Sequence, residues 1–191
     1  MNVTAAMTSS STTQMPRIAF MGPMGVGKTT AIRALCGDDM VESDVPNLDR
    51  QSHAKDFTTV GAEFGQIDLG NGEFVQVCGC PGQDRFDFLR QWVVSASVGV
   101  FVMVDANAPD AVQSTGALLA EAAAAEHPPL ALVLSTRTAS AATMQALANG
   151  LQTAGHGVVP VVLQVDVRKR ADVLQALAVL VSMLSLCSES P

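Results

Sequence analysis

The stretch that decides the fold is RIAFMGPMGVGKTT, residues 17–30. It begins with a short apolar run, Arg17–Met21, which predicts a buried strand. A glycine-rich turn follows, and the pattern from Lys28 to Cys36 predicts a helix that ends at Gly37. A strand that enters a glycine-rich turn and then a helix is typical of the first unit of an α/β fold with a mostly parallel sheet.

The turn fits the phosphate-binding pattern G-x-x-x-x-G-K-[ST] at every required position. Its glycines let the chain wrap inward so that backbone amides face a phosphate, and the helix N-terminus adds partial positive charge. Lys28 is expected to reach the β- and γ-phosphates, and the Thr29 hydroxyl to bind Mg²⁺. The predicted phosphate-binding residues are Gly22, Pro23, Met24, Gly25, Val26, Gly27, Lys28, Thr29, Thr30 and, further along the chain, Gly82. The sequence therefore predicts a nucleotide site.

Strands and helices alternate along the rest of the chain. The apolar patterns predict strands at Ala62–Leu69, Glu73–Cys78, Val98–Asp105, Leu130–Leu134 and Val158–Val165, and helices at Pro109–Glu126, Ser140–Ala154 and Lys169–Leu186. Gly70-Asn71-Gly72 predicts a hairpin, so one strand should run antiparallel to its neighbour. Met40–Phe57 is polar and too long for an ordinary connection, and we expect irregular structure there. The sum is a doubly wound sheet of six strands, mostly parallel, with about five helices and a ligand beyond the carboxyl ends of the strands.

Composition limits the class of protein and its partners. The chain has 191 residues, of which 48% are hydrophobic, and this suits one domain, expected at 16–187 after a disordered Ser/Thr-rich tail at 1–15. A net charge of −7 disfavours nucleic acid as a partner, because phosphate neutralisation needs clustered Lys and Arg. The four cysteines form no CxxC pair, and no apolar run reaches about 18 residues. We therefore expect a cytoplasmic protein without an integral membrane segment.

Two further segments resemble the switches of the Ras-like small GTPases. Thr58-Thr59-Val60-Gly61 precedes the hairpin, and the resemblance implies that Thr59 binds Mg²⁺ and senses the γ-phosphate. Pro81-Gly82-Gln83-Asp84-Arg85-Phe86 follows the next strand and resembles the second switch, A/P-G-Q-E-R-F. There the resemblance implies that Gln83 orients the attacking water. A strand-start threonine and a solvated Pro-Gly turn are the plainer interpretations.

The resemblance covers 16–186 and extends to a bacterial branch of these proteins. Gly79–Phe86 is similar to the G-T-P-G-Q-E-R-F segment of bacterial small GTPases related to the signal-recognition-particle receptor β-subunit and to the gliding-motility protein MglA. It implies a Ras-like P-loop fold that binds GTP or GDP with Mg²⁺, switches between states and hydrolyses GTP slowly. It also implies small protein partners of the roadblock or longin type.

Two positions depart from the family's pattern. Gly79 stands where Ras-like proteins have the Asp of D-x-x-G, and Asp105 is the first candidate to replace that carboxylate. Ser135-Thr136-Arg137-Thr138 stands where N/T-K-x-D reads guanine, and it lacks a carboxylate. The base-binding residues expected from this loop and the one after the last strand are Ser135, Thr136, Arg137, Thr138, Asp166 and Val167.

Three functions fit these features. The first is a GTP-hydrolysing switch. The second is a pseudo-GTPase, a binding module with little turnover, which the missing carboxylates favour and the intact Lys28, Thr29 and Gln83 oppose. The third is a small-molecule kinase, which would need an arginine-bearing lid, whereas the late part of the chain offers one basic cluster, Arg168-Lys169-Arg170.

Overall fold

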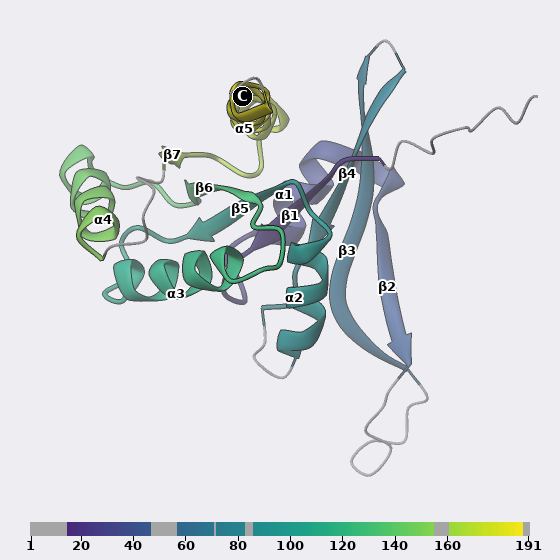
Figure 1. Ribbon diagram of the computed structural model, residues 1–191, viewed down its shortest axis with the longest axis horizontal. Coiled ribbons are helices and arrows are strands. Elements are labelled where there is room, and N and C mark those ends of the chain that lie inside the picture. The colour runs from purple at the N-terminus through teal and green to yellow at the C-terminus, as the bar shows by residue number, and fades with distance from the viewer. Residues whose placement is uncertain (1–14, 47–56, 71, 83–85, 155–160, 189–191) are drawn as a thin grey trace, which may run out of the picture.

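One mixed sheet organises the part of the chain that the structure describes (Figure 1). The computed structural model describes residues 15–46, 57–70, 72–82, 86–154 and 161–188, with the backbone alone for 42–46, 57–62 and 188. The strands are β1 Arg17–Met21, β2 Val41–Pro46, β3 Phe57–Gly70, β4 Glu73–Gly79, β5 Gly99–Val104, β6 Leu130–Ser135 and β7 Val162–Gln164. The helices are α1 Lys28–Cys36, the 3₁₀ helix η1 Gly37–Asp39, α2 Asp87–Ser95, α3 Ala111–Ala123, α4 Ala141–Thr153 and α5 Arg170–Ser188.

The strand order confirms the predicted α/β fold. Neighbours follow the order β2-β3-β4-β1-β5-β6-β7. Strands β4, β1, β5, β6 and β7 are parallel, and β3 is antiparallel to both β2 and β4. The antiparallel strand and its hairpin to β4 are therefore where the sequence predicted them.

The sheet in the described residues has seven strands instead of the predicted six. The additional strand, β2, lies in the polar segment for which we expected irregular structure, and it pairs with β3, which begins at Phe57 instead of Ala62. An edge strand needs only one partner and tolerates charged residues, so VESDVP can pair without an apolar pattern. The rest of that segment, 47–56, lies outside the described residues.

Helices cover both faces of the sheet (Figure 1). Helices α1 and α5 pack on one face, together with Phe20 and Phe101, whose ring centroids are 5.0 Å apart. Helices α2, α3 and α4 pack on the other face, where Ala19 and Val102 are buried. Alternate residues of β1 and β5 therefore enter opposite cores, which explains why these strands are apolar almost throughout.

Helix α5 is apolar beyond what its packing requires. Val173, Leu177 and Leu180 pack in the core, and the window Arg170–Cys187 has a mean hydropathy of 1.6 with 22% of it buried. Among the described helices it is the one whose length and composition would suffice to cross a membrane. Helices that lie against a protein core also meet this test, so the finding by itself assigns α5 no membrane role.

Candidate functional site

The loops that follow the parallel strands meet at one edge of the sheet. Parallel strands end on the same side, so the segments after β1, β4, β6 and β7 are neighbours in space although they are far apart in sequence. This edge carries most of the residues that the sequence predicted to bind a nucleotide. The site has a phosphate side, at the loop after β1, and a base side, at the loops after β6 and β7.

The glycine-rich loop between β1 and α1 has the backbone that phosphate binding requires. Gly22 and Gly27 have φ angles of 150° and 109°, which side chains other than glycine rarely allow. A Cβ atom at Gly22 would also lie 2.6 Å from the Met103 carbonyl oxygen. The loop therefore turns tightly against β5 and leads directly into the N-terminus of α1, where backbone N–H groups are available to an anion.

Lys28 is the buried cation of this loop. The residue is 8% exposed, and its Nζ donates hydrogen bonds to the carbonyl oxygens of Gly22 (2.8 Å) and Pro23 (3.0 Å). Burial lowers the pKa of Lys28, and the nearby Glu63 carboxylate acts against that shift. The ammonium group is thus held across the loop, where it can exchange a carbonyl for a charged phosphate oxygen and make a stronger bond.

The segment after β4 closes against the same lysine. A Cβ atom at Gly82 would lie 2.9 Å from Lys28 Nζ and 2.8 Å from the backbone nitrogen of Met24. Only glycine lets the chain pass this close to the loop. The structure therefore brings Gly82, which is distant in sequence, next to the phosphate-binding loop, and its predicted contact with a phosphate stays a prediction.

Glu63 is a residue of this site that the sequence reasoning missed. Its Oε1 accepts a hydrogen bond from the Thr29 hydroxyl, and its Oε2 has no hydrogen-bond partner among the described residues. The residue is 7% exposed on β3, and Ile67, four residues along the same strand, is buried as well. A carboxylate on the buried side of a predicted strand was the signal that could have revealed it.

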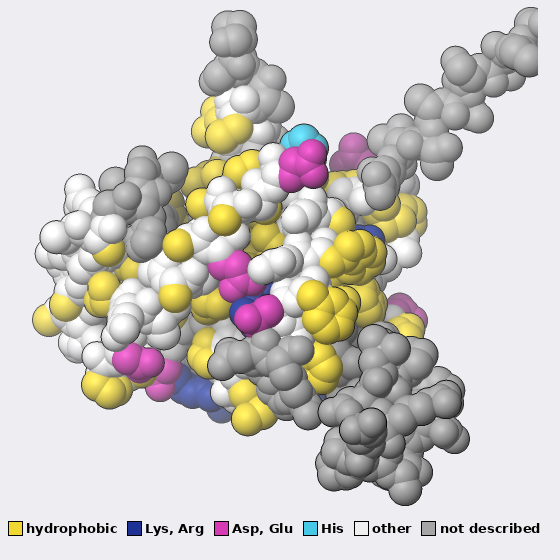
Figure 2. Space-filling model, turned by 60° about the horizontal axis from the view of Figure 1, so that its bottom comes forward, with side chains coloured by type: hydrophobic (Ala, Val, Ile, Leu, Met, Phe, Trp, Pro, Cys, Tyr) yellow, Lys and Arg dark blue, Asp and Glu magenta, His cyan; other side chains and the backbone are white. Residues whose placement is uncertain are grey.

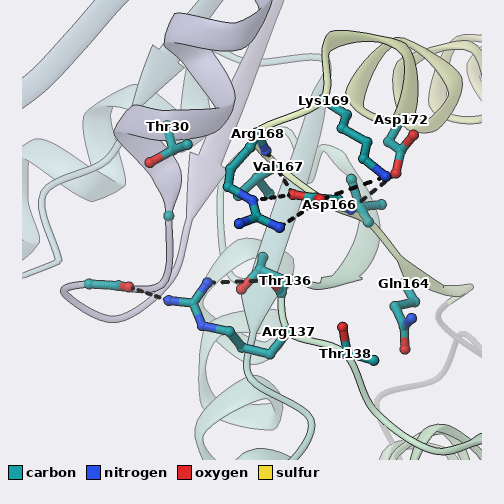
Figure 3. A pocket seen from close by; sticks show the side chains of 13 residues that line it. Thr30, Thr136, Arg137, Thr138, Gln164, Asp166, Val167, Arg168, Lys169 and Asp172 are labelled. Atoms are coloured by element: carbon teal, nitrogen blue, oxygen red, sulfur yellow. Dashed lines mark hydrogen bonds and ion pairs between the residues drawn. The ribbon is translucent and has the colours of Figure 1, made fainter.

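The base side of the edge is a pocket of about 630 Å³ (Figure 3). Five predicted base residues line it together with parts of the phosphate loop: Thr136, Arg137, Thr138, Asp166 and Val167. Ser135 was predicted with them but lies outside the pocket, because it is fully buried and its hydroxyl donates to the Arg137 carbonyl oxygen. Thr30 lines the pocket from the α1 side.

Thr136 and Arg137 brace the phosphate loop. The Thr136 hydroxyl donates to the Val26 carbonyl oxygen at 2.8 Å, and the Arg137 guanidinium donates to the Gly25 carbonyl oxygen at 3.1 Å. Figure 3 shows the Arg137 side chain extending towards that carbonyl. These two side chains therefore connect the base side of the site to its phosphate side.

Asp166 has its carboxylate occupied by Arg168. The Arg168 side chain donates to both carboxylate oxygens, at 2.8 and 2.9 Å, and its backbone nitrogen donates to Oδ1 at 3.2 Å. These hydrogen bonds from Arg168 lower the pKa of Asp166 to about 2. The carboxylate that we expected to face a base is therefore ionised but already paired.

Sequence reasoning did not select five further residues that line this pocket: Gln164, Val165, Arg168, Lys169 and Asp172. Gln164 accepts a hydrogen bond from the Ala139 backbone nitrogen through Oε1 at 3.0 Å, so it connects the loops after β6 and β7. Asp172 accepts from the Asp166 backbone nitrogen at 3.3 Å. Their position directly around Asp166 and at the end of β7 was the available signal.

Three further residues predicted from the sequence are Gln83, Thr59 and Asp105. Gln83 lies outside the described residues, so the structure does not test its role. The backbone of Thr59 lies in β3, opposite Asp44 of β2, and its side chain is among those not described. Asp105, the first candidate for the missing carboxylate, instead accepts hydrogen bonds from the Asn107 backbone nitrogen at 2.9 Å and side chain at 3.0 Å, whereas Glu63 is the carboxylate beside Thr29.

A parallel sheet with a glycine-rich loop between β1 and α1, a buried lysine in that loop and an adjoining pocket defines a P-loop nucleotide-binding protein. Within that class, a comparison with protein families identifies the particular family. The chain belongs to the 50S ribosome-binding GTPase family, whose model matches residues 17–136, more than half of the chain. Membership of this GTPase family supports GTP or GDP as the ligand, and the matched part runs from β1 to Thr136. No curated protein matches the chain.

Proposed function

We propose that the protein is a small GTP-binding molecular switch that hydrolyses GTP slowly. The observation that carries the proposal is the contact between Gly82 and the phosphate loop, where a Cβ would lie 2.9 Å from Lys28 Nζ. A γ-phosphate that binds Lys28 would adjoin the backbone of Gly82. Binding or loss of the γ-phosphate would therefore change the contacts of the segment between β4 and α2. A segment ordered by the γ-phosphate and released on hydrolysis is the usual switch of such proteins.

Mg²⁺ fits the donor groups at this site. The Thr29 hydroxyl is bonded to one oxygen of the buried Glu63 carboxylate, whose other oxygen has no hydrogen-bond partner in the part of the chain that the structure describes. Hard oxygen donors of this kind are the ligands that Mg²⁺ prefers. Thr29 would hold the ion together with phosphate oxygens, and Thr59 is the second ligand that the family resemblance implies. When bound, the ion would neutralise developing charge on the phosphates.

We expect a protein partner that recognises one nucleotide state of the switch. Helix α2 directly follows the switch segment and leaves Phe88 and Trp92 exposed by 62% and 57%. Figure 2 views the molecule from the side of α2 and shows hydrophobic side chains beside acidic and basic ones. Aromatic residues surrounded by charge are typical of protein interfaces. From the resemblance to bacterial small GTPases related to MglA, we propose a cytoplasmic protein with partners of the roadblock or longin type.

Single-turnover hydrolysis tests this function. Protein purified without denaturation should contain GDP or GTP by mass analysis, and bound GTP should hydrolyse at about 10⁻³ s⁻¹ or more slowly without a partner. The Gln83→Leu variant should lower that rate about tenfold while the affinity for GTP is unchanged, because a water-orienting side chain acts on the chemical step. The matched control is Gln145→Leu, at an exposed position on α4, which should leave the hydrolysis rate unchanged. A preparation that binds neither nucleotide would refute the proposal.

The pseudo-GTPase remains a second candidate because of one observation, the pairing of Asp166 with Arg168. A base pocket whose carboxylate is occupied would select guanine weakly. A protein that binds GTP and ATP alike, shows no turnover with or without a partner, and has the same rate in Gln83→Leu would be this binding module.

A further inference from the structure

We propose that Glu63 on β3 supplies the carboxylate for Mg²⁺ at the phosphate site. It would replace the strand-end aspartate of Ras-like proteins, whose position is taken here by Gly79. The proposal rests on the proposed function, since it concerns the metal that accompanies the nucleotide. It adds to that function an acidic residue for the metal, which neither the phosphate-binding loop nor the two switch segments supply.

Strand pairing sets Glu63 directly beside position 79. The antiparallel register pairs Phe64 of β3 with Cys78 of β4, and one step further along the ladder Glu63 comes opposite Gly79. A Cβ atom at Gly79 would lie 2.1 Å from Glu63 Oε2, closer than any real contact. The Glu63 carboxylate therefore occupies the place where a side chain at position 79 would begin. Glycine at 79 and glutamate at 63 are therefore complementary, because a side chain at position 79 would displace the Glu63 carboxylate from its place beside Thr29.

The environment of this carboxylate points to a cation. Glu63 is 7% exposed, Oε1 is bonded to the Thr29 hydroxyl, and Oε2 has no hydrogen-bond partner among the described residues. A buried carboxylate with an unsatisfied oxygen is unfavourable unless a cation or water completes its coordination. Burial lowers the pKa of Lys28, and the Glu63 charge opposes that shift, so Glu63 acts on the phosphate loop electrostatically as well. A hydroxyl and an acidic oxygen side by side at the start of α1 form the donor set that Mg²⁺ takes in sites completed by phosphates.

The plain alternative is that Glu63 only accepts the hydrogen bond from Thr29 and fixes the start of α1. The Glu63→Gln variant distinguishes the two roles. Glutamine keeps the length and an oxygen acceptor for Thr29, so a purely structural role would survive the substitution. It removes the charge, so a role in Mg²⁺ binding would not survive.

The experiment is release of fluorescent GDP measured across a titration of free Mg²⁺. The proposal expects Mg²⁺ to slow release from the wild type, and Glu63→Gln to raise the Mg²⁺ concentration for half of that effect about 10- to 100-fold, the range for losing a group that supports a metal ligand. GDP affinity in EDTA should be unchanged. Glu73→Gln, which removes the same charge from an exposed position on β4, is the matched control and should behave as wild type.

The outcomes separate the two proposals. If wild-type protein binds GDP and responds to Mg²⁺ but Glu63→Gln responds equally, Glu63 is not the metal carboxylate and the GTP-binding function stands. If wild-type protein binds no GDP at all, the proposed function fails. Mn²⁺ provides a direct second readout, because its electron paramagnetic resonance signal reports metal bound to the GDP complex. That signal should persist in Glu73→Gln and weaken in Glu63→Gln at the same Mn²⁺ concentration.

A charge exchange between the strands completes the test if Glu63→Gln folds poorly. Gly79→Asp alone should lower the melting temperature, because it places a second carboxylate beside the buried Glu63 carboxylate and the like charges repel. Glu63→Ala combined with Gly79→Asp removes the repulsion and returns a carboxylate from β4. The double variant should regain the melting temperature and the Mg²⁺ response that Glu63→Ala lacks. A folded double variant that remains as insensitive to Mg²⁺ as Glu63→Ala would overturn the proposal.

Discussion

The phosphate side and the base side of this site are built by different means. On the phosphate side, backbone amides, positive-φ glycines and one buried lysine form the cradle. On the base side, a mixture of buried and exposed side chains lines a pocket, and some of them pair with one another, as Asp166 and Arg168 do (Figure 3). A cradle made of backbone tolerates little change, whereas a surface made of side chains can lose its specificity without loss of the fold.

Exposure makes the two sides unequal in strength. Lys28 is 8% exposed, whereas the Arg168 side chain is 80% exposed. Charges in low-dielectric surroundings interact strongly, and exposed ion pairs contribute about 0–1 kcal/mol. We therefore expect the phosphate side to supply most of the affinity for a nucleotide, and the base side to supply a smaller part that determines selectivity.

The largest loss of nucleotide affinity is expected from Lys28→Ala. Removing one partner of a buried charged hydrogen bond costs about 2–5 kcal/mol, so GDP affinity should fall about 1,000-fold. The fold should survive because the side chain reaches into the site and not into the core. Calorimetry with GDP measures the loss, and circular dichroism checks the fold. The control is Lys169→Ala in the base pocket, whose exposed amine should matter only a few-fold. Near-wild-type affinity in folded Lys28→Ala would refute the phosphate assignment.

A smaller and more selective effect is expected from Gly82→Ala. The added Cβ would lie 2.8 Å from the Met24 backbone nitrogen and 2.9 Å from Lys28 Nζ, next to the γ-phosphate position. We expect affinity for a non-hydrolysable GTP analogue to fall about 10- to 100-fold, and GDP affinity only a few-fold, since overpacking of this kind costs about 1–3 kcal/mol. Competition binding of the two nucleotides gives the ratio. Equal losses for both would mean that the segment after β4 does not discriminate between nucleotide states.

The smallest effect is expected on the base side, where substitutions should change the preference for GTP over ATP. The wild type should prefer GTP to ATP by less than about 10⁴-fold, the level that a fully satisfied polar site can reach. Arg168→Ala removes the two side-chain hydrogen bonds to the Asp166 carboxylate, which can then accept one from the base, and this should raise the preference about fivefold. Competition binding with both nucleotides measures it, and Asp166→Asn combined with Arg168→Ala should cancel the gain. A preference that Arg168→Ala leaves unchanged would exclude Asp166 as a base ligand.

Sequence reasoning predicted the parts of the site that depend on local pattern. The loop from Gly22 to Thr29 carries its conformation in its own glycines and in the strand and helix on either side, so it was assigned almost residue by residue. The apolar runs of β1 and β5 likewise predicted strands buried on both faces. Patterns of this kind are complete within about ten residues, so they are readable without knowledge of the rest of the fold.

The parts that depend on pairing between distant segments were not predictable in this way. Glu63 reaches Thr29 only because β3 pairs with β4 in one particular register, and a shift of one residue would turn the side chain to the other face. Strand β2 likewise forms because β3 offers it an edge and not because its own sequence favours a strand. The occupied carboxylate of Asp166 depends on a rotamer of Arg168, which composition does not determine.

The position of Trp92 gives the protein a built-in optical reporter. The chain contains one tryptophan and no tyrosine, so its intrinsic fluorescence comes almost entirely from α2. The indole is 57% exposed, and the Arg17 guanidinium carbon lies 5.4 Å from the ring centroid. Emission from such a ring changes with the solvent and the charge around it. Any movement of α2 relative to β1 would therefore alter the brightness of the unlabelled protein, and stopped-flow recording would follow that movement in real time.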